Sequence, residues 1–259
     1  MIGIEFLSDY MRDYSDGYIL IGGNACALHF EKLDVQFRET VDLDIVLIIE
    51  SNDENFYIHL RNYIEENGYK GKVFNGSNPG GSAYRFKLPD DLKGGNKPGQ
   101  IELFSKKPDY FDAAESEKLH ITPIEAGEGV SNFSAILLDD EIYSFILGSK
   151  QEIKNVSTVN LECLLGLKSI AWHGNQKLYD KEEIKNYGDV IKHPDDMLSI
   201  IAVIDIEEMS CPKIVFDSLE ISKKLFSEDR IRQELSARDA SEFEGAIEFI
   251  NEFVKQKIS

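Results

Sequence analysis

The chain has 259 residues, of which 42% are hydrophobic and 10% aromatic, the composition of a globular protein with a substantial core. Its formal net charge of -19 argues against general binding to nucleic acid, which depends on Lys and Arg. The sequence contains no run of about 18 to 20 apolar residues, and its acidic N-terminal segment does not resemble a secretory signal. We therefore expect a cytoplasmic protein with no membrane partner, and the length favours two domains.

A strand, a glycine turn, a helix and a second strand are predicted in succession near the N-terminus. A buried strand over Tyr18 to Ile21 ends at Gly22-Gly23, and a short helix follows from about Asn24 to Leu33. The second strand opens with Asp42-Leu43-Asp44. A glycine turn at the start of a helix lets backbone N–H groups approach phosphate oxygens, so this segment is a candidate phosphate cradle.

The two aspartates of the second strand form a candidate metal site. Because side chains alternate across a strand, Asp42 and Asp44 point to the same face. Two like charges this close are unfavourable unless a cation or a proton lies between them. Carboxylate oxygens are hard ligands that favour Mg²⁺ over zinc, so the pair predicts a magnesium site.

A third carboxylate is predicted further along the chain. After an amphipathic helix over Asn55 to Asn67, strands are expected over Ala83 to Leu88 and Gln100 to Ser105. Glu102 lies inside the second of these apolar strands, where a charge without a partner is costly. It is therefore the candidate third metal ligand. The alternative is an edge strand whose polar face lies in water.

Basic residues gather in one part of this acidic chain. Between Lys70 and Lys107 there are eight basic and three acidic residues, a local net charge of +5. Such an island could guide a polyanion to one place while the rest of the protein repels it. It could equally be a hairpin whose edge strands carry Lys to prevent aggregation. The basic residues are Lys70, Lys72, Arg85, Lys87, Lys93, Lys97, Lys106 and Lys107.

The second half of the chain changes from strands to helices. Ile136 to Leu138 and Glu141 to Leu147 predict a hairpin around Asp139-Asp140. Helices are expected near 160–173, 180–193, 195–206, 213–226 and 239–257. This order predicts an α+β protein with one domain over residues 1–155 and a C-terminal helical bundle over residues 156–259.

Two groups of motifs resemble a known superfamily. Gly22 to Ala25 (GGNA) and Arg38 to Ile45 (RETVDLDI) resemble the signature of the nucleotidyltransferases typified by DNA polymerase β. Leu161 to Trp172 (LECLLGLKSIAW) and Tyr179 to Val190 (YDKEEIKNYGDV) resemble the AbiEii-type branch, the toxins of type IV toxin–antitoxin systems. The resemblance covers about residues 15 to 190. It implies a polymerase β-like domain with a mixed sheet in front of the helical bundle.

The resemblance also implies roles for individual residues. Asp42, Asp44 and Glu102 would bind Mg²⁺, while Gly22, Gly23 and Asn24 would contact the triphosphate of an NTP. Lys168 would lie at the phosphates or near the acceptor, and Asp189 would position it or act as a base. The implied activity is transfer of a nucleotide from an NTP to an acceptor such as RNA, including the acceptor end of tRNA, opposed by a cognate antitoxin.

Two other functions are compatible with the same sequence. The acidic net charge suits a small cationic acceptor, for instance an antibiotic, better than it suits RNA. A degenerate nucleotide-binding module that kept the fold and lost the chemistry is the other alternative, because a fold alone does not establish an activity.

Overall fold

The computed structural model describes residues 4–48, 54–73, 83–94, 97–106, 121–123 and 134–257. The chain divides into two compact units, residues 1–159 and residues 160–259. The division falls directly after the last strand of the large sheet, whereas the sequence placed the domain boundary between residues 155 and 156.

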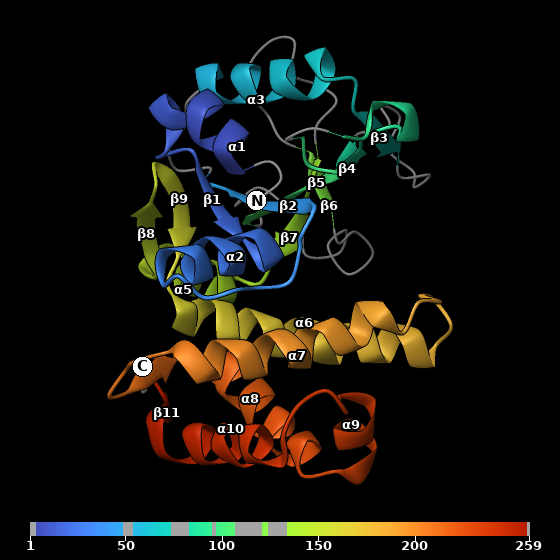
Figure 1. The fold of residues 1–259 in the computed structure, drawn as a ribbon. Helices are drawn as coiled ribbons and strands as arrows, with labels where there is room; N and C mark the ends of the chain where they lie inside the picture. The colour runs from blue at the N-terminus through green and yellow to red at the C-terminus, as the bar shows by residue number, and fades with distance from the viewer. Residues whose placement is uncertain are drawn as a thin grey trace, which may run out of the picture. The chain divides into compact units, whose positions relative to one another are not determined.

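A mixed sheet forms the centre of the first unit (Figure 1). Strand β2 is antiparallel to β1 and parallel to β5, so the sheet is mixed, which is compatible with the predicted α+β class. The path of strands is β3-β4-β5-β2-β1-β9-β8, with β7 paired to β5 and β6 paired to β7. The strands are β1 (Tyr18–Ile21), β2 (Asp42–Leu47), β3 (Lys70–Val73), β4 (Ala83–Lys87), β5 (Gln100–Lys106), β6 (Ile121–Pro123), β7 (Ser134–Leu138), β8 (Lys150–Ile153) and β9 (Val156–Val159).

Helices lie on both sides of this sheet. Figure 1 shows α1 and α3 on one side, and α2 with α5 on the other. Phe56 of α3 stacks on the buried Tyr18 of β1, with ring centroids 6.4 Å apart. On the other side, the hydroxyl of Tyr143 in α5 donates to the carbonyl of Leu47 at 3.4 Å. The helical segments are α1 (Ile4–Tyr10), η1 (Arg12–Tyr14), α2 (Gly22–Lys32), α3 (Glu54–Glu66), η3 (Asp90–Leu92) and α5 (Asp140–Gly148).

Helix α5 corrects one prediction. The segment Glu141 to Leu147 is helical, so the predicted hairpin around Asp139-Asp140 is wrong. Asp139 caps the helix, because its carboxylate accepts from the backbone N–H of Glu141 at 2.8 Å. Ile142, Tyr143 and Ile146 then share a buried stripe at helical spacing, which a strand would place on alternating faces.

The strands that carry the predicted acids have one buried and one polar face. Along β5, Ile101 and Leu103 are buried while Gln100 and Glu102 remain partly exposed. Strand β5 is not an edge strand, because it lies between β4 and β2. The edge-strand explanation of Glu102 is therefore wrong, and Glu102 lies on the interior of a polar sheet face.

The second unit consists mainly of helices. Its core includes Trp172, whose ring centroid lies 5.3 Å from that of Phe226. The helix predicted at 213–226 has the bounds of α8. The elements are α6 (Leu161–Asp180), α7 (Gly188–Val203), β10 (Met209–Cys211), α8 (Lys213–Phe226), α9 (Asp229–Glu234), α10 (Ala240–Phe253) and β11 (Val254–Gln256), with β10 and β11 paired in parallel.

Helix α7 differs from the two helices predicted for this region. It runs through Pro194, where the sequence indicated a new helix start. Proline removes one backbone hydrogen bond, but Val190, Met197 and Ile200 are all buried along the same helix. The burial of this continuous apolar stripe offsets the missing bond, so α7 continues through Pro194. It begins only at Gly188, so the part of the predicted helix over residues 181–187 is wrong. Across the described ranges, none of the helices combines the length and apolar character needed to cross a membrane.

Candidate functional site

The turn between β1 and α2 contacts the second strand through a glycine. Gly22 has a φ of +76°, in the left-handed region that favours glycine. A Cβ atom at this position would overlap the carboxylate of Asp44, the residue paired with Ile21 across β1 and β2. The absence of a side chain at Gly22 therefore lets the Asp44 carboxylate lie directly against the start of α2.

The second glycine gives room to the segment that enters β2. A Cβ atom at Gly23 would lie 2.7 Å from Cγ2 of Thr40 and 3.4 Å from an Nη atom of Arg38. The exposed guanidinium of Arg38 thus lies beside the N-terminus of α2. Sequence reasoning did not assign Arg38 a role of its own, although the residue is part of the RETVDLDI motif.

Asn24 connects the glycine turn to the acidic strand. It is fully buried, and its Nδ2 donates to the backbone carbonyl of Asp42 at 2.6 Å. Its Oδ1 accepts from the hydroxyl of Thr40 at 2.8 Å. The side chain of Asn24 therefore fixes Asp42 relative to α2. Its predicted contact with the triphosphate stays a prediction.

The three predicted carboxylates lie on the polar face of neighbouring strands. Asp44 of β2 is the direct partner of Glu102 on β5, and Asp42 is the partner of Gln100. Neighbouring strands lie about 4.8 Å apart, so the backbones hold Asp44 and Glu102 side by side. Asp42 and Asp44 are both partly exposed, and each is within reach of a ligand from solvent.

Glu102 has a basic partner in the structure. Nε of Arg85, on β4, donates to Oε1 of Glu102, and the two residues are direct partners across the strands. The side chain of Glu102 is 12% exposed and that of Arg85 is 32% exposed. The ion pair with Arg85 offsets the desolvation cost of the Glu102 carboxylate in this strand. From the sequence, Arg85 was identified only as one of the basic residues between Lys70 and Lys107. The register between paired strands cannot be read from a single sequence.

The donor set of this face suits Mg²⁺ in its chemistry and its backbone placement. All three side chains supply carboxylate oxygens, the ligands that Mg²⁺ prefers. Within the described ranges, however, no three His, Cys, Asp or Glu side chains are gathered closely enough to hold a metal ion. Glu102 instead accepts from Arg85. Arg85 contacts Oε1 of Glu102, so a cation could reach Glu102 through its other carboxylate oxygen or after the ion pair opens.

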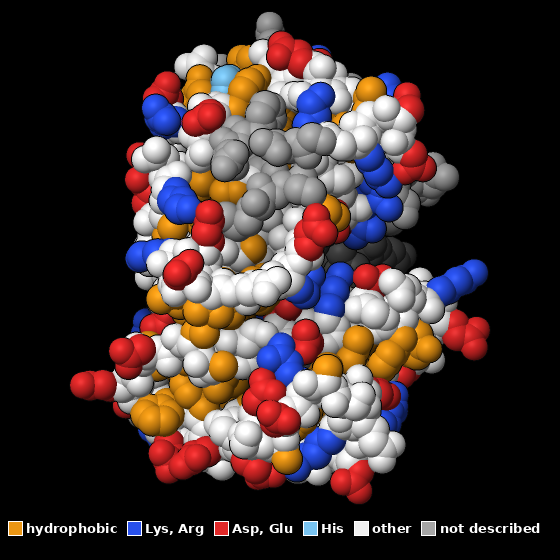
Figure 2. Space-filling model, in the orientation of Figure 1, with side chains coloured by type: hydrophobic (Ala, Val, Ile, Leu, Met, Phe, Trp, Pro, Cys, Tyr) orange, Lys and Arg blue, Asp and Glu red, His pale blue; other side chains and the backbone are white. Residues whose placement is uncertain are grey.

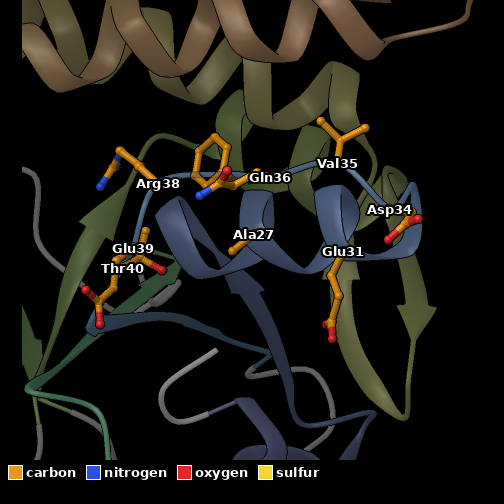
Figure 3. Close-up of a pocket in the computed structure, with 9 residues that line it drawn as sticks. Ala27, Glu31, Asp34, Val35, Gln36, Arg38, Glu39 and Thr40 are labelled. Atoms are coloured by element: carbon orange, nitrogen blue, oxygen red, sulfur yellow. The ribbon is translucent and has the colours of Figure 1, made fainter.

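A groove runs between α2 and the segment that leads into β2 (Figure 3). It has a volume of about 600 Å³ and reaches Thr40, next to the glycine turn. Three acidic residues, Glu31, Asp34 and Glu39, contribute to its lining. The other lining residues are Ala27, Val35, Gln36, Phe37, Arg38 and Thr40.

Lys168 lies inside the second unit. Its Nζ is 2.6 Å from Oδ2 of Asp196, and the two side chains are only 6% and 1% exposed. The ammonium is thus held between α6 and α7. Sequence reasoning missed Asp196, because nothing in its local pattern distinguishes it from the neighbouring Asp195.

Asp189 lies in the first turn of α7 and is half exposed. Its carboxylate accepts from Nζ of Lys192 at 3.2 Å, and its backbone carbonyl accepts from Nδ2 of Asn175 at 2.9 Å. A carboxylate in this position is favoured by the helix dipole. The catalytic roles predicted for Lys168 and Asp189 stay predictions.

Comparison of the chain with models of known protein families found no match, and comparison with curated proteins found none.

Proposed function

We propose that the chain is a Mg²⁺-dependent nucleotidyltransferase with a polymerase β-like first unit. It would act in the cytoplasm as an AbiEii-like toxin that transfers a nucleotide from an NTP to RNA, opposed by a cognate antitoxin. The observation that carries the proposal is the contact between Gly22 and Asp44, because it joins a helix N-terminus to a row of carboxylates. These are the two parts that binding of a metal–triphosphate requires.

Each part has a separate task in this proposal. The backbone N–H groups at the start of α2 hold phosphate oxygens, and glycine at positions 22 and 23 permits their close approach. Asp42, Asp44 and Glu102 hold Mg²⁺, which neutralises phosphate charge when bound. Arg85 balances the charge of Glu102 in the structure, and Glu102 is one of the three residues that would hold the cation. In the proposed step the acceptor hydroxyl would lose its proton to water, its oxygen would bond to the α-phosphorus, and pyrophosphate would leave with the electron pair of the broken P–O bond.

Transfer of a label from an NTP tests the proposal. Incubation with NTPs labelled at the α-phosphate, Mg²⁺ and total RNA should label RNA. Asp44→Asn removes one metal ligand with little change in size, so the rate should fall by at least about a hundredfold. Asp16→Asn is the matched control, because Asp16 is almost fully exposed in the same unit and should leave the rate unchanged. Wild-type labelling by Asp44→Asn would remove Asp44 from the site.

The groove supports a second candidate function. Glu31, Asp34 and Glu39 give it an acidic lining beside the glycine turn. This lining favours a small cationic acceptor, as the net charge of the chain does. NTP consumption that depends on a cationic antibiotic, without labelling of RNA, would favour this function over RNA modification.

The pairing of Arg85 with Glu102 supports a third candidate. If Arg85 permanently occupies the place of the cation, the first unit is a nucleotide-binding module without catalytic activity. Calorimetric titration with Mg²⁺ and an NTP distinguishes the cases. Binding of the NTP that is independent of Mg²⁺ would favour the inactive module, whereas binding that requires both favours the transferase.

A further inference from the structure

The polar sheet face of the first unit continues beyond the carboxylates to a basic end. The cross-strand partner of Lys70 on β3 is Lys87 on β4, and the partner of Lys87 is Gln100 on β5. Gln100 is in turn the partner of Asp42 on β2. Directly opposed residues point to the same face, so these four side chains form one row that runs from Lys70 to Asp42.

A second row lies beside the first. It begins with Arg85, two residues before Lys87 on β4, and continues through Glu102 to Asp44. Residues two apart on a strand share a face, so both rows end at the predicted metal ligands. We define Lys70, Arg85 and Lys87 as the basic strip. The strip and the carboxylates are thus opposite ends of one continuous surface.

Lys70 and Lys87 are an unfavourable pair as they stand. Both side chains are exposed, and like charges directly opposite one another destabilise a sheet. Neither lysine forms a salt bridge with another residue of the ranges that the structure describes. Protection of a sheet edge accounts for Lys70 on β3, but not for Lys87, because β4 lies between β3 and β5. An anion bound across both lysines would relieve the repulsion.

The chain segment that contains the basic strip is itself positively charged. The segment from Lys70 to Lys107 carries a net charge of +5 in a chain of net charge -19. Figure 2 shows Lys and Arg side chains gathered over the side of the first unit where β3 and β4 lie in Figure 1. A polyanion would be repelled from most of the protein and attracted to this one side, which fixes where it binds.

We infer that the basic strip binds the phosphodiester backbone of a nucleic acid and leads its end toward Asp42 and Asp44. This inference rests on the proposed function, for which it supplies the acceptor-binding surface. From Lys70 to Asp42 the row crosses three strand spacings of about 4.8 Å, or about 14 Å. At about 3.4 Å for each stacked nucleotide, the row accommodates about four nucleotides. The rest of the chain is acidic and still repels nucleic acid.

A binding assay without NTP or Mg²⁺ tests the strip separately from catalysis. Fluorescently labelled single-stranded RNA is titrated with wild type and with the double variant Lys70→Glu, Lys87→Glu. We expect the variant to bind about tenfold or more weakly, and the slope of log K against log salt to become less steep by about 1.4, because two phosphate contacts are lost. DNA of the same sequence should show the same loss if the phosphates alone are recognised, and a loss confined to RNA assigns a contribution to the 2′-hydroxyls.

The control variant carries the same change in net charge elsewhere. Lys255 and Lys257 are exposed residues of the second unit, and Lys255→Glu, Lys257→Glu should bind RNA as wild type does. Equal loss in both double variants would overturn the inference, because net charge alone would then explain it. The inference would also be overturned if Lys70→Glu, Lys87→Glu left the RNA affinity unchanged. Binding of polyglutamate, but not of RNA, through the strip would overturn it as well.

Two further variants separate the strip from folding and from the proposed chemistry. Lys70→Glu alone places opposite charges across β3 and β4, so Tm should rise slightly while RNA affinity falls. If Lys70 had only a structural role, Lys70→Glu would raise Tm without lowering the affinity for RNA. Asp44→Asn should bind RNA at least as tightly as wild type, because it removes a negative charge near the RNA end, even though transfer is lost. Failure of the proposed function and failure of the strip therefore give different results. If charge reversal prevents folding, Lys70→Gln, Lys87→Gln carries the same test.

Discussion

Each unit contains one ion pair that joins two strands or two helices and includes a predicted site residue. The two pairs differ in their exposure to water. Arg85 and Glu102 lie on a sheet face with 32% and 12% of their side chains exposed. Lys168 and Asp196 lie between two helices with 6% and 1% exposed. A partly hydrated pair can exchange partners at modest cost, whereas separation of a buried pair leaves a charge without solvation. We therefore expect the sheet pair to respond to ligands and the helix pair to hold the fold.

Other polar residues of the two units show a similar contrast. In the second unit, the hydroxyl of Ser169 lies 2.7 Å from that of Ser218 and 2.9 Å from that of Ser222, all of them buried. In the first unit, Lys70 and Lys87 instead oppose each other at the surface. These buried serines satisfy one another inside the second unit, whereas Lys70 and Lys87 present their charges to solvent, where a ligand can reach them.

The largest effect is expected from truncation of the buried pair. Lys168→Ala removes the ammonium that lies against the buried carboxylate of Asp196 in the core of the second unit, which should cost about 3 to 5 kcal/mol of unfolding free energy. The matched truncation Arg85→Ala, on the sheet face, should cost about 1 kcal/mol or less. Urea unfolding of both variants, followed by circular dichroism, measures the difference.

A double variant controls this comparison. Lys168→Met with Asp196→Leu removes both charges and keeps apolar volume, so it should recover much of the stability that Lys168→Ala loses. Equal costs for Lys168→Ala and Arg85→Ala would contradict the distinction between a fixed pair and an exchangeable one.

A smaller effect is expected from pH. Burial lowers the pKa of His173 below its usual 6.5, a shift to which the nearby Lys177 also contributes, although a hydrogen bond to the carbonyl of Ser218 opposes it. Below about pH 6.5 the unfolded chain therefore binds a proton that the folded chain resists, so stability falls as pH falls. The contribution should not exceed about 1.4 kcal/mol for each pH unit.

Unfolding midpoints at about pH 7.5 and pH 5.5, compared between wild type and His173→Gln, measure this contribution of His173. Glutamine keeps a donor near Ser218 and Ser222 but does not titrate in this range. The loss of stability on acidification should be smaller in the variant. An identical loss in both proteins would show that His173 does not contribute to it.

Local patterns predicted those features of the molecule that depend on neighbouring residues. Strand alternation placed Asp42 and Asp44 on one face, and Pro212 indicated the start of α8. The partners of Glu102 and Lys168 depend on strand register and helix packing between distant segments, which a single sequence does not contain. The same limit explains α7, since burial of its apolar stripe outweighs the local preference of Pro194 to start a helix.

A structure with Mg²⁺ and a non-hydrolysable NTP analogue tests the central claim most directly. Because the Arg85–Glu102 pair is exchangeable in this account, Glu102 should leave Arg85 and join Asp42 and Asp44 around the cation. The oxygen–Mg²⁺ distances should be about 2.0 to 2.1 Å. The triphosphate should lie against Gly22 and Gly23 at the start of α2. If Glu102 remains paired with Arg85 and no cation lies between Asp42 and Asp44, the carboxylate face is not the metal site and the proposed nucleotidyl transfer is contradicted.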